Sequence, residues 1–426
     1  MFKLLSLRSE FTKNTFILIA GTVGAQSIPL ILQPFLRRIY SPEDFGAMSV
    51  YLSLLGVITI VSALRYEATI VLPKNDNEAA NILSLTFIIN IVFNGILLLA
   101  LLLFRNEIAA LINFPKKYSV LLYLLPFACS FFGIYQSINY WLIRQKAFKA
   151  STGNKIVRRG IEGTVQLFLG LFKFSGGLFI GDIAGNLANG ISGIRQAFKN
   201  RFDLKFVSRK KIGYVFKKYI DFPKYNVIPT LLSNAATVLP FLFVNKIYST
   251  ETVGYLDLSR LVLSIPLIFI SATISQVFFQ HITEKKHHSL SIKNEAKNIL
   301  YLLAIIIFIE IVLVLLAGPQ LFGFVFGETY VVSGSFSQLL VFSFSLNFIS
   351  STFSSIFITF EKIKLNSIWQ ITYFFAICSL LFFTKLEIYD FLKIYVAIEI
   401  IMHLAYCSMI YLIVKKYEKG VKINSL

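Results

Sequence analysis

RIYSPEDFG occupies residues 38–46, and KIYSTETVG occupies residues 246–254, about 208 residues further along the chain. Each stretch joins two long apolar runs, and the order of the apolar segments around both copies agrees. Residues 141–148 and 356–363 also resemble each other, at a similar offset. Repetition over half a chain is typical of membrane bundles that arose by duplication. The sequence therefore predicts one membrane unit built twice.

The composition places this unit in a lipid bilayer. Of the 426 residues, 56% are hydrophobic and only 15% are charged, which is far more apolar than a soluble domain. A helix needs roughly 20 apolar residues to cross a bilayer, and continuous apolar runs exclude the alternation of membrane strands. We predict an all-α integral membrane protein with twelve transmembrane helices, at residues 14–36, 45–64, 82–104, 118–142, 156–174, 176–198, 224–246, 253–279, 297–317, 331–358, 366–384 and 391–414.

Lysine and arginine alternate between successive loops. With twelve spans, 30 of the 41 basic residues fall on the side of the N-terminus and nine on the opposite side, while Arg195 and Arg260 lie inside spans. An excess of basic residues marks the cytoplasmic side, so both termini are predicted to be cytoplasmic. The net charge of +19 is then an orientation signal, and basic residues that flank helices do not indicate nucleic-acid binding. Membrane lipids are the expected partners of this charge, above all for the basic loop at residues 199–224.

The same loop divides the chain in half. We expect an N-terminal six-helix lobe at residues 1–198, a basic cytoplasmic linker at 199–223 and a C-terminal six-helix lobe at 224–426. Because each half holds an even number of helices, both halves enter the membrane from the same side. The pseudo-twofold axis between them is therefore predicted to lie along the membrane normal.

The N-terminal residues resemble a known group of proteins. The stretches LRRIYSPEDFG (36–46), LRYEATIVLP (64–73) and NEAANI (77–82) are similar to polysaccharide biosynthesis proteins of the Wzx type, which include the O-antigen flippases. The strongest likeness covers residues 11–105, and the twelve-helix layout extends it over nearly the whole chain. The motif at residues 41–44 also has a purely structural interpretation, because Ser41 as N-cap, Pro42 and two acids make a good helix start.

The resemblance implies a member of the multidrug, oligosaccharidyl-lipid and polysaccharide exporter superfamily, with two MATE-like lobes. Its expected activity is transport without enzymatic chemistry: a flippase moves a polyprenyl-pyrophosphate-linked oligosaccharide from the cytoplasmic to the outer leaflet of the bacterial inner membrane by alternating access. The product serves surface polysaccharide synthesis, either of O-antigen or of capsule. The implied partners are the lipid-linked oligosaccharide, a coupling ion (H⁺ or Na⁺) and other polysaccharide assembly proteins. No cofactor and no metal site are expected.

A pyrophosphate needs a cationic path through the membrane, and arginine suits that role because its planar fork binds two oxygens. Arg260 lies about 10 Å into the eighth expected span, where charge is costly and marks a functional site. Arg65, at the end of the second span, fits an entry contact, or a side chain that snorkels to the headgroups. Arg158 and Arg159, one turn inside the fifth span, fit pyrophosphate binding or an ordinary cytoplasmic flank.

Acidic residues and one histidine inside spans are candidates for ion pairing or ion coupling. Asp257 lies three residues before Arg260 and fits an ion pair with it, in which case the pair has a structural role. Glu310 and the pair Glu399 and His403 fit coupling to H⁺ or Na⁺, or a hydrogen-bonded role in the core. Asp182, beside a glycine, fits a helix cap or a position on the cavity wall. Glycines of the sixth span, such as Gly185, favour close helix packing.

Two other functions compete with a flippase. A cation-coupled multidrug exporter of the same superfamily shares the two lobes, and carboxylates in place of arginines at the site would favour it. A membrane polysaccharide polymerase or ligase is expected to carry a large outer loop with catalytic side chains. Here the longest outer loop runs only from 105 to 117.

Overall fold

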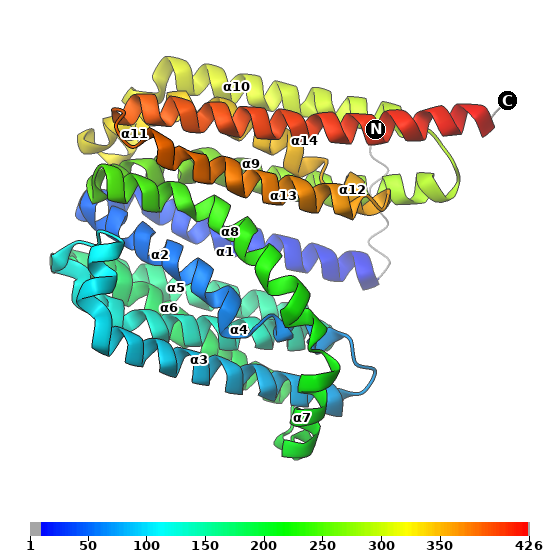
Figure 1. The fold of residues 1–426 in the computed structure, drawn as a ribbon, viewed down its shortest axis with the longest axis horizontal. Helices are drawn as coiled ribbons and strands as arrows, with labels where there is room; N and C mark the ends of the chain where they lie inside the picture. Colours follow the sequence, from blue (N-terminus) through cyan, green and yellow to red (C-terminus); the bar gives the residue numbers. More distant parts are fainter. Residues whose placement is uncertain (1–9, 425–426) are drawn as a thin grey trace. The chain divides into compact units, whose positions relative to one another are not determined.

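The computed structural model describes residues 10–424, and the regular elements in that range are all helical (Figure 1). The long helices are α1 (Glu10–Ile39), α2 (Pro42–Ser62), α3 (Asp76–Leu111), α4 (Leu125–Arg144), α5 (Phe148–Leu171), α6 (Gly177–Lys199), α8 (Asp221–Ile247), α9 (Thr250–His287), α10 (Lys293–Phe326), α11 (Val331–Thr352), α13 (Ile363–Cys378) and α14 (Ile388–Asn424). Shorter elements are α7 (Arg209–Lys218), α12 (Ser355–Thr359) and the 3₁₀ helices η1 (Tyr66–Val71), η2 (Lys116–Leu124), η3 (Leu204–Phe206), η4 (Glu328–Tyr330) and η5 (Ser379–Phe383).

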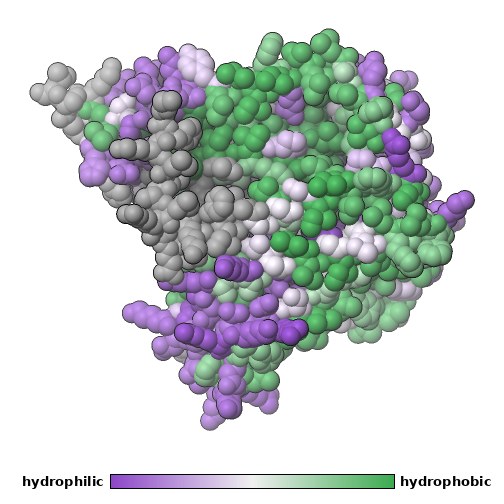
Figure 2. Space-filling model, turned by 180° about the vertical axis from the view of Figure 1, so that it is seen from behind, coloured by the Kyte–Doolittle hydropathy of each residue, from purple (hydrophilic) through white to green (hydrophobic). Residues whose placement is uncertain are grey.

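Nine helices of the described range are long and apolar enough to cross a membrane. They correspond to nine of the twelve expected spans. The other three expected spans are the helices α1, α5 and α6, of 30, 24 and 23 residues. Apolar side chains cover much of the molecular face in Figure 2, as a bilayer requires. The helical membrane fold is confirmed, while the count of twelve spans and the cytoplasmic termini remain predictions.

The chain forms two compact units. The described part of unit 1 comprises residues 10–238 and 249–253, and unit 2 comprises residues 239–248 and 254–424. The division falls inside α8, between Val238 and Leu239.

Helix α6 is the centre of unit 1. It packs against α5 and α4, and α5 packs in turn against α1. The approach of α5 to α6 depends on glycine, because a Cβ at Gly185 would lie 2.9 Å from the Arg158 carbonyl oxygen. A Cβ at Gly181 would likewise lie 2.9 Å from the Glu162 carbonyl oxygen. Close packing, the expected role of the glycines in this helix, is confirmed at Gly185.

Unit 2 is held together by α11, which packs against both α10 and α14. Helix α13 covers another part of α14. Aromatic side chains dominate the interior where these helices meet, and Phe348, Phe357 and Tyr406 belong to one buried cluster. Large aromatic surfaces of this kind supply much of the packing energy of a helical bundle.

The loop at residues 199–223 is not a simple linker, because part of it folds and docks on unit 1. Val215 of α7 and the preceding Phe202 are buried in one apolar cluster with residues of α3 and α4. Asn81 of α3 holds the segment from both sides: its amide nitrogen donates to the Phe206 carbonyl at 2.8 Å, and its amide oxygen accepts from the Ser208 N–H at 2.9 Å. In Figure 1, α7 lies at the end of unit 1.

The repeated motif starts a helix in each half. Ser41 caps α2 in a capping box: its hydroxyl accepts the Asp44 N–H at 3.2 Å, and the Asp44 carboxylate accepts the Ser41 N–H at 2.8 Å. Pro42 occupies the first turn, as expected. In the second copy, the Ser249 hydroxyl accepts the Thr252 N–H at 3.1 Å. The structural interpretation of the motif is therefore confirmed.

Candidate functional site

Unit 2 contains a cluster of charged, polar and aromatic side chains that we name the α14 cluster. Its members are Arg260, Ser350, Trp369, Tyr373, Glu399 and His403. Glu399 and His403 lie one turn apart on α14, and each is only 5% exposed. This spacing of four residues puts both side chains on the same face of the helix. An ionisable pair so deeply buried persists only with hydrogen-bond partners.

Those partners come from two other helices. One oxygen of the Glu399 carboxylate accepts the Tyr373 hydroxyl at 2.6 Å, and the other lies 3.1 Å from His403 Nε2. On the far side of the ring, His403 Nδ1 lies 3.0 Å from the Ser350 hydroxyl oxygen. Helices α11, α13 and α14 are thus joined by one chain of polar contacts.

Arg260 lies close to this chain. Its guanidinium carbon is 4.4 Å from the centre of the Phe241 ring, a cation–π distance. Its charge acts on the Glu399 carboxylate and on the hydroxyl of Tyr373. The sequence suggested Arg260 and Glu399 for separate roles, and the structure brings them into one cluster. Asp257, expected to pair with Arg260, lies half-buried one turn earlier on α9.

The aromatic members of the cluster were missed by the sequence reasoning. Trp369 and Tyr373 stack with ring centres 5.1 Å apart and an angle of 3° between their planes. The Trp369 indole N–H donates to the Met402 carbonyl oxygen at 2.8 Å, which fixes the ring against α14. Their spacing of four residues places both rings on one face of α13. Aromatic spacing alone is common in helix cores, so it would not have singled them out.

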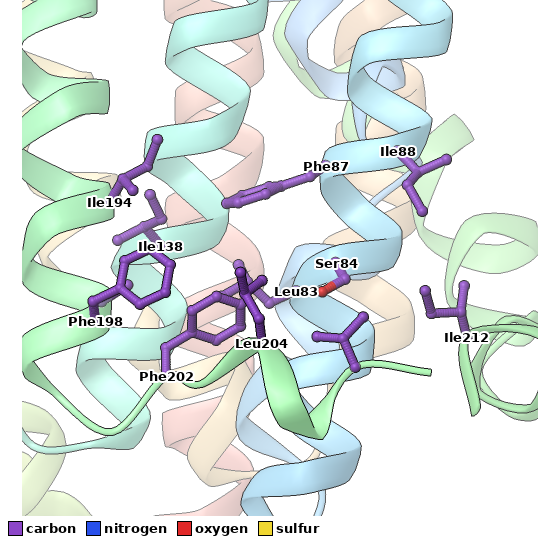
Figure 3. Close-up of a pocket in the computed structure, with 12 residues that line it drawn as sticks. Leu83, Ser84, Phe87, Ile88, Ile138, Ile194, Phe198, Phe202, Leu204 and Ile212 are labelled. Atoms are coloured by element: carbon purple, nitrogen blue, oxygen red, sulfur yellow. The ribbon is translucent and has the colours of Figure 1, made fainter. Parts of the chain in front are cut away.

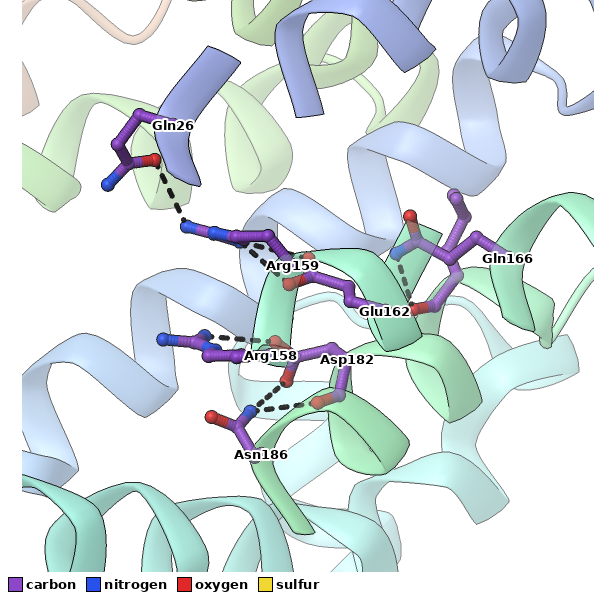
Figure 4. A network of polar contacts seen from close by, with 8 residues as sticks. Gln26, Arg158, Arg159, Glu162, Gln166, Asp182 and Asn186 are labelled. Carbon is purple, nitrogen blue, oxygen red and sulfur yellow. Dashed lines mark hydrogen bonds and ion pairs between the residues drawn. The ribbon is translucent and has the colours of Figure 1, made fainter. Parts of the chain in front are cut away.

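Unit 1 contains a second polar network, between α5 and α6 (Figure 4). Arg158 lies 3.5 Å from the Asp182 carboxylate, and Arg159 lies 2.8 Å from the Glu162 carboxylate. Asn186 donates to Asp182 at 3.0 Å. Each arginine is thus paired with a carboxylate, and a role of either in pyrophosphate binding stays a prediction. The cap expected at Asp182 is wrong, because α6 begins at Gly177 and Asp182 is buried inside it.

Further polar atoms lie buried around this network. Four buried side chains have a polar atom without a hydrogen-bond partner among the described residues. They are the hydroxyls of Tyr51 and Tyr135 and the amides of Asn186 and Asn189. Buried polar groups without partners are rare in proteins. They give the interior of unit 1 capacity for additional hydrogen bonds.

Arg65 lies at the turn between α2 and η1, where its backbone is left-handed with φ of 62°. Its guanidinium lies 3.3 Å from the carboxylate of Glu67, which is 4% exposed. Burial raises the pKa of Glu67, an effect that its own backbone N–H and the nearby Arg65 oppose. Arg65 therefore already serves one buried carboxylate, although its side chain remains partly exposed.

Glu310 lies half-buried on α10, in unit 2. One of its carboxylate oxygens is buried without a hydrogen-bond partner in the described range. Burial of a carboxyl oxygen without a hydrogen bond costs free energy. Glu310 therefore stays a candidate for a functional role. Within residues 10–424, no three His, Cys, Asp or Glu side chains are grouped to hold a metal ion.

MATE transporters are among the solved structures with the same fold. An inward-facing multidrug resistance MATE family transporter of the MOP superfamily matches with a TM-score of 0.70 and 14% identity, over 94% of this chain and 99% of that one. An outward-facing transporter of the same description matches with a TM-score of 0.55 and 13% identity, over 96% of this chain and 97% of that one. The Vibrio cholerae MATE transporter VcmN in its bent form matches with a TM-score of 0.55 and 14% identity, over 96% and 97%.

At such low identity these likenesses establish the fold, which is that of a multi-pass membrane protein. The curated proteins include no significant match. A family match covers residues 35–335, well over half of the chain. The chain belongs to the polysaccharide biosynthesis protein family.

Proposed function

We propose that the protein is a flippase for a polyprenyl-pyrophosphate-linked oligosaccharide. It moves the headgroup from the cytoplasmic to the outer leaflet of the bacterial inner membrane, as one step of O-antigen or capsule synthesis. The observation that carries this proposal is Arg260, a half-buried cation against the ring of Phe241 in a protein of the polysaccharide biosynthesis family. The division of the chain into two compact units supports a mechanism of alternating access.

Arg260 suits a pyrophosphate for two reasons. Its guanidinium can donate two parallel hydrogen bonds to phosphate oxygens, and burial strengthens the attraction of the opposite charge. The ring of Phe241 beneath it stabilises the cation in a place where water is scarce. The stacked rings of Trp369 and Tyr373 supply flat apolar faces of the kind on which the CH groups of a sugar pack.

The α14 cluster also has two ways to distribute protons. The single Ser350 hydroxyl proton is within reach of both His403 Nδ1, at 3.0 Å, and the Asn347 carbonyl oxygen, at 3.0 Å. If Ser350 donates to His403, the ring is neutral and donates from Nε2 to Glu399. If Ser350 donates to Asn347, Nδ1 must donate to Ser350, and with Nε2 still donating to Glu399 the ring carries a positive charge. The cluster therefore accepts one extra proton without losing a contact with His403.

This proton links transport to the charge of the site. While His403 is neutral, Glu399 offsets the charge of Arg260. With the extra proton on His403, the net charge of the α14 cluster is one unit more positive, which favours a pyrophosphate beside Arg260. We therefore propose H⁺ as the coupling ion.

A cation-coupled multidrug exporter is the alternative. Two observations favour this alternative. The chain resembles a multidrug resistance MATE transporter in fold, and the carboxylates of Asp182 and Glu399 are buried. The two functions differ in the sign of the substrate. Arg260 repels an organic cation, so its removal would leave cation export intact or improve it.

Transport in proteoliposomes tests the proposal. A labelled polyprenyl pyrophosphate oligosaccharide is placed in one leaflet, and its arrival in the other is followed for wild type, Arg260→Gln and the control Lys393→Gln. Lys393 is an exposed cation on α14. Loss of one charge-assisted contact corresponds to about a ten- to hundredfold lower rate at limiting substrate. Absence of transfer by the wild type would overturn the function, and normal transfer by Arg260→Gln would overturn the site.

A further inference from the structure

Unit 1 holds an apolar cavity whose lining includes none of the charged residues of the network between α5 and α6. Its volume is about 230 Å³, and it is lined by residues of α3, α4 and α6 and of the segment at 202–212 (Figure 3). Ile194 and Phe198 of α6 face Phe87 of α3 across it, and Phe202 and Leu204 lie at one end. The single hydroxyl in its wall, that of Ser84, already donates to the Ala80 carbonyl at 2.9 Å. The cavity therefore offers a ligand only apolar contact.

The mouth of this cavity opens where lipid tails are expected. Its wall begins at Leu83 and reaches Ile88, about 10–18 Å along α3 from the start of the helix at Asp76. Because the expected span begins at residue 82, this stretch lies about 2–9 Å into the hydrocarbon core of a bilayer. Ile88 and Phe198 are each 48% exposed at the rim, although the remainder of the wall includes fully buried side chains such as Ile138. Space for about eight groups the size of a water molecule accommodates part of an alkyl chain.

A polar cavity adjoins the apolar one. It has a volume of about 610 Å³ and shares Phe198 and Phe202 with its neighbour. Its charged residues are Arg201, Asp76 and Asp203. Both carboxylates have partners: Asp76 lies 3.0 Å from Arg144, and Asp203 accepts the Lys205 N–H at 2.9 Å. Arg201 has neither an ion pair nor a hydrogen bond to the side chains of the described range.

The surroundings of Arg201 are strongly basic. Residues 199–224 include nine lysines and arginines and only two acidic residues. On α7, basic residues at both ends flank a central apolar stretch that includes the exposed Tyr214 and Phe216, a composition found in helices that lie at a membrane surface. Hydrophilic side chains gather at the bottom of Figure 2, the end of the molecule where Figure 1 places α7. The apolar cavity thus lies beside a cationic surface on the side that the charge distribution predicts to be cytoplasmic.

We propose that these two cavities form a binding site for one anionic phospholipid of that leaflet. An acyl chain occupies the apolar cavity between α3 and α6, and the phosphate lies in the adjoining polar cavity against Arg201. The surrounding charge favours an anionic headgroup, because Arg144 neutralises Asp76 and residues 199–224 include nine basic residues against two acidic ones. The bound lipid would hold residues 202–212, which include the start of α7, against α3.

The test is lipid binding to the purified full-length protein, measured by native mass spectrometry after removal of bound lipid. Phosphatidylglycerol and phosphatidylcholine with identical oleoyl chains are titrated in parallel. We expect phosphatidylglycerol to bind more tightly, and Arg201→Gln to weaken it about fivefold, the effect of one basic residue at an anionic surface. The matched control is Arg195→Gln, which removes an exposed arginine of α6 that lines neither cavity.

A second pair of variants tests the apolar cavity. Ile88→Trp fills its mouth and should weaken phosphatidylglycerol binding roughly tenfold, as expected when about two methylenes are withdrawn. Ile91→Trp adds the same ring one turn further along α3, at a residue 59% exposed that does not line the cavity, and should have no effect. Unfolding temperatures confirm that each variant is folded. Equal binding of the two lipids, equal loss with Arg201→Gln and Arg195→Gln, unchanged binding with Ile88→Trp, or displacement of phosphatidylglycerol by an equimolar polyprenyl phosphate would each overturn the proposal.

Discussion

Replacement of Glu399 by alanine tests whether the α14 cluster is a connected unit. The substitution removes the acceptor of the Tyr373 hydroxyl, at 2.6 Å, and the partner of His403 Nε2, at 3.1 Å. Both hydrogen-bonding groups then remain in an interior where Glu399 and His403 are each 5% exposed. Removal of one partner from a buried charged pair costs about 3–5 kcal/mol of unfolding free energy. For a unit of this size we expect the unfolding temperature to fall by about 6–20 °C.

Asp390→Asn is the matched control on the same helix. Asp390 lies 2.8 Å from Lys393, a shorter distance than that from Glu399 to His403, but these two side chains are 56% and 62% exposed. An exposed ion pair contributes about 0–1 kcal/mol, because water screens both charges. The control should therefore shift the unfolding temperature by at most about 4 °C. Burial, not distance, separates the two expectations.

Thermal unfolding in detergent, followed by circular dichroism, measures both variants without relying on Trp369, which is itself part of the cluster. His403→Ala and the double variant complete a double-mutant cycle. Because Glu399 and His403 contact each other, the double variant should lose less stability than the sum of the single ones, by about 0.5–3 kcal/mol. A shift for Glu399→Ala no larger than that for Asp390→Asn, or strict additivity in the cycle, would refute the reasoning.

Three further predictions concern unit 1. Gly185→Ala should lower stability by about 1–3 kcal/mol, because its Cβ would lie 2.9 Å from the α5 backbone. Gly153→Ala has open space at its Cβ and should be neutral or raise stability by up to about 1 kcal/mol. Thermal unfolding of both variants tests this difference. Burial raises the pKa of Glu67, so its contribution to stability is present below the ordinary value of 4.5 and lost as the pH rises through the raised pKa. The unfolding temperature of wild type relative to Glu67→Gln should therefore fall from pH 4.5 to neutral pH, and a constant difference would contradict this. Ser41→Ala removes the acceptor of the Asp44 N–H and should cost about 1 kcal/mol, measured by denaturant or thermal unfolding; no loss would mean that the capping box does not stabilise α2.

The membrane helices and their starts could be predicted because their signals are local. An apolar run such as residues 82–104 has few alternatives to a helix in a bilayer, and Ser41 with Pro42 marks the first turn of α2 within four residues. Helix α5 was harder, since Lys155, Arg158 and Arg159 lower its hydropathy. The structure explains how it tolerates them: the arginines pair with carboxylates on α5 and α6. A hydropathy average treats each of these charges as unpaired, and so it underestimates how well α5 fits a membrane.

The candidate site depends on contacts that no local pattern contains. Arg260 and Glu399 belong to α9 and α14, and nothing in either segment indicates that the charge of one acts on the other. The pairing of Arg260 with Asp257, the nearest carboxylate in sequence, stays a prediction. By contrast, the fold of the 199–223 loop had a local signal. Ile212, Val215 and Tyr219 recur at helical spacing between basic residues, and Val215 proves to be buried.

The two halves repeat their scaffold but not their charges. The tyrosine of each motif donates to a backbone carbonyl far along its own half: Tyr40 to Gln166 at 2.7 Å, and Tyr248 to Leu386 at 2.7 Å. The polar interiors differ. In unit 1 the charges are arginine–carboxylate pairs, and arginine does not lose its proton. In unit 2 the buried pair is Glu399 with His403, and an imidazole has a neutral form as well as a charged one. The duplicated motif thus supplies a common frame, and the basic member of the buried pairs differs in kind between the two units.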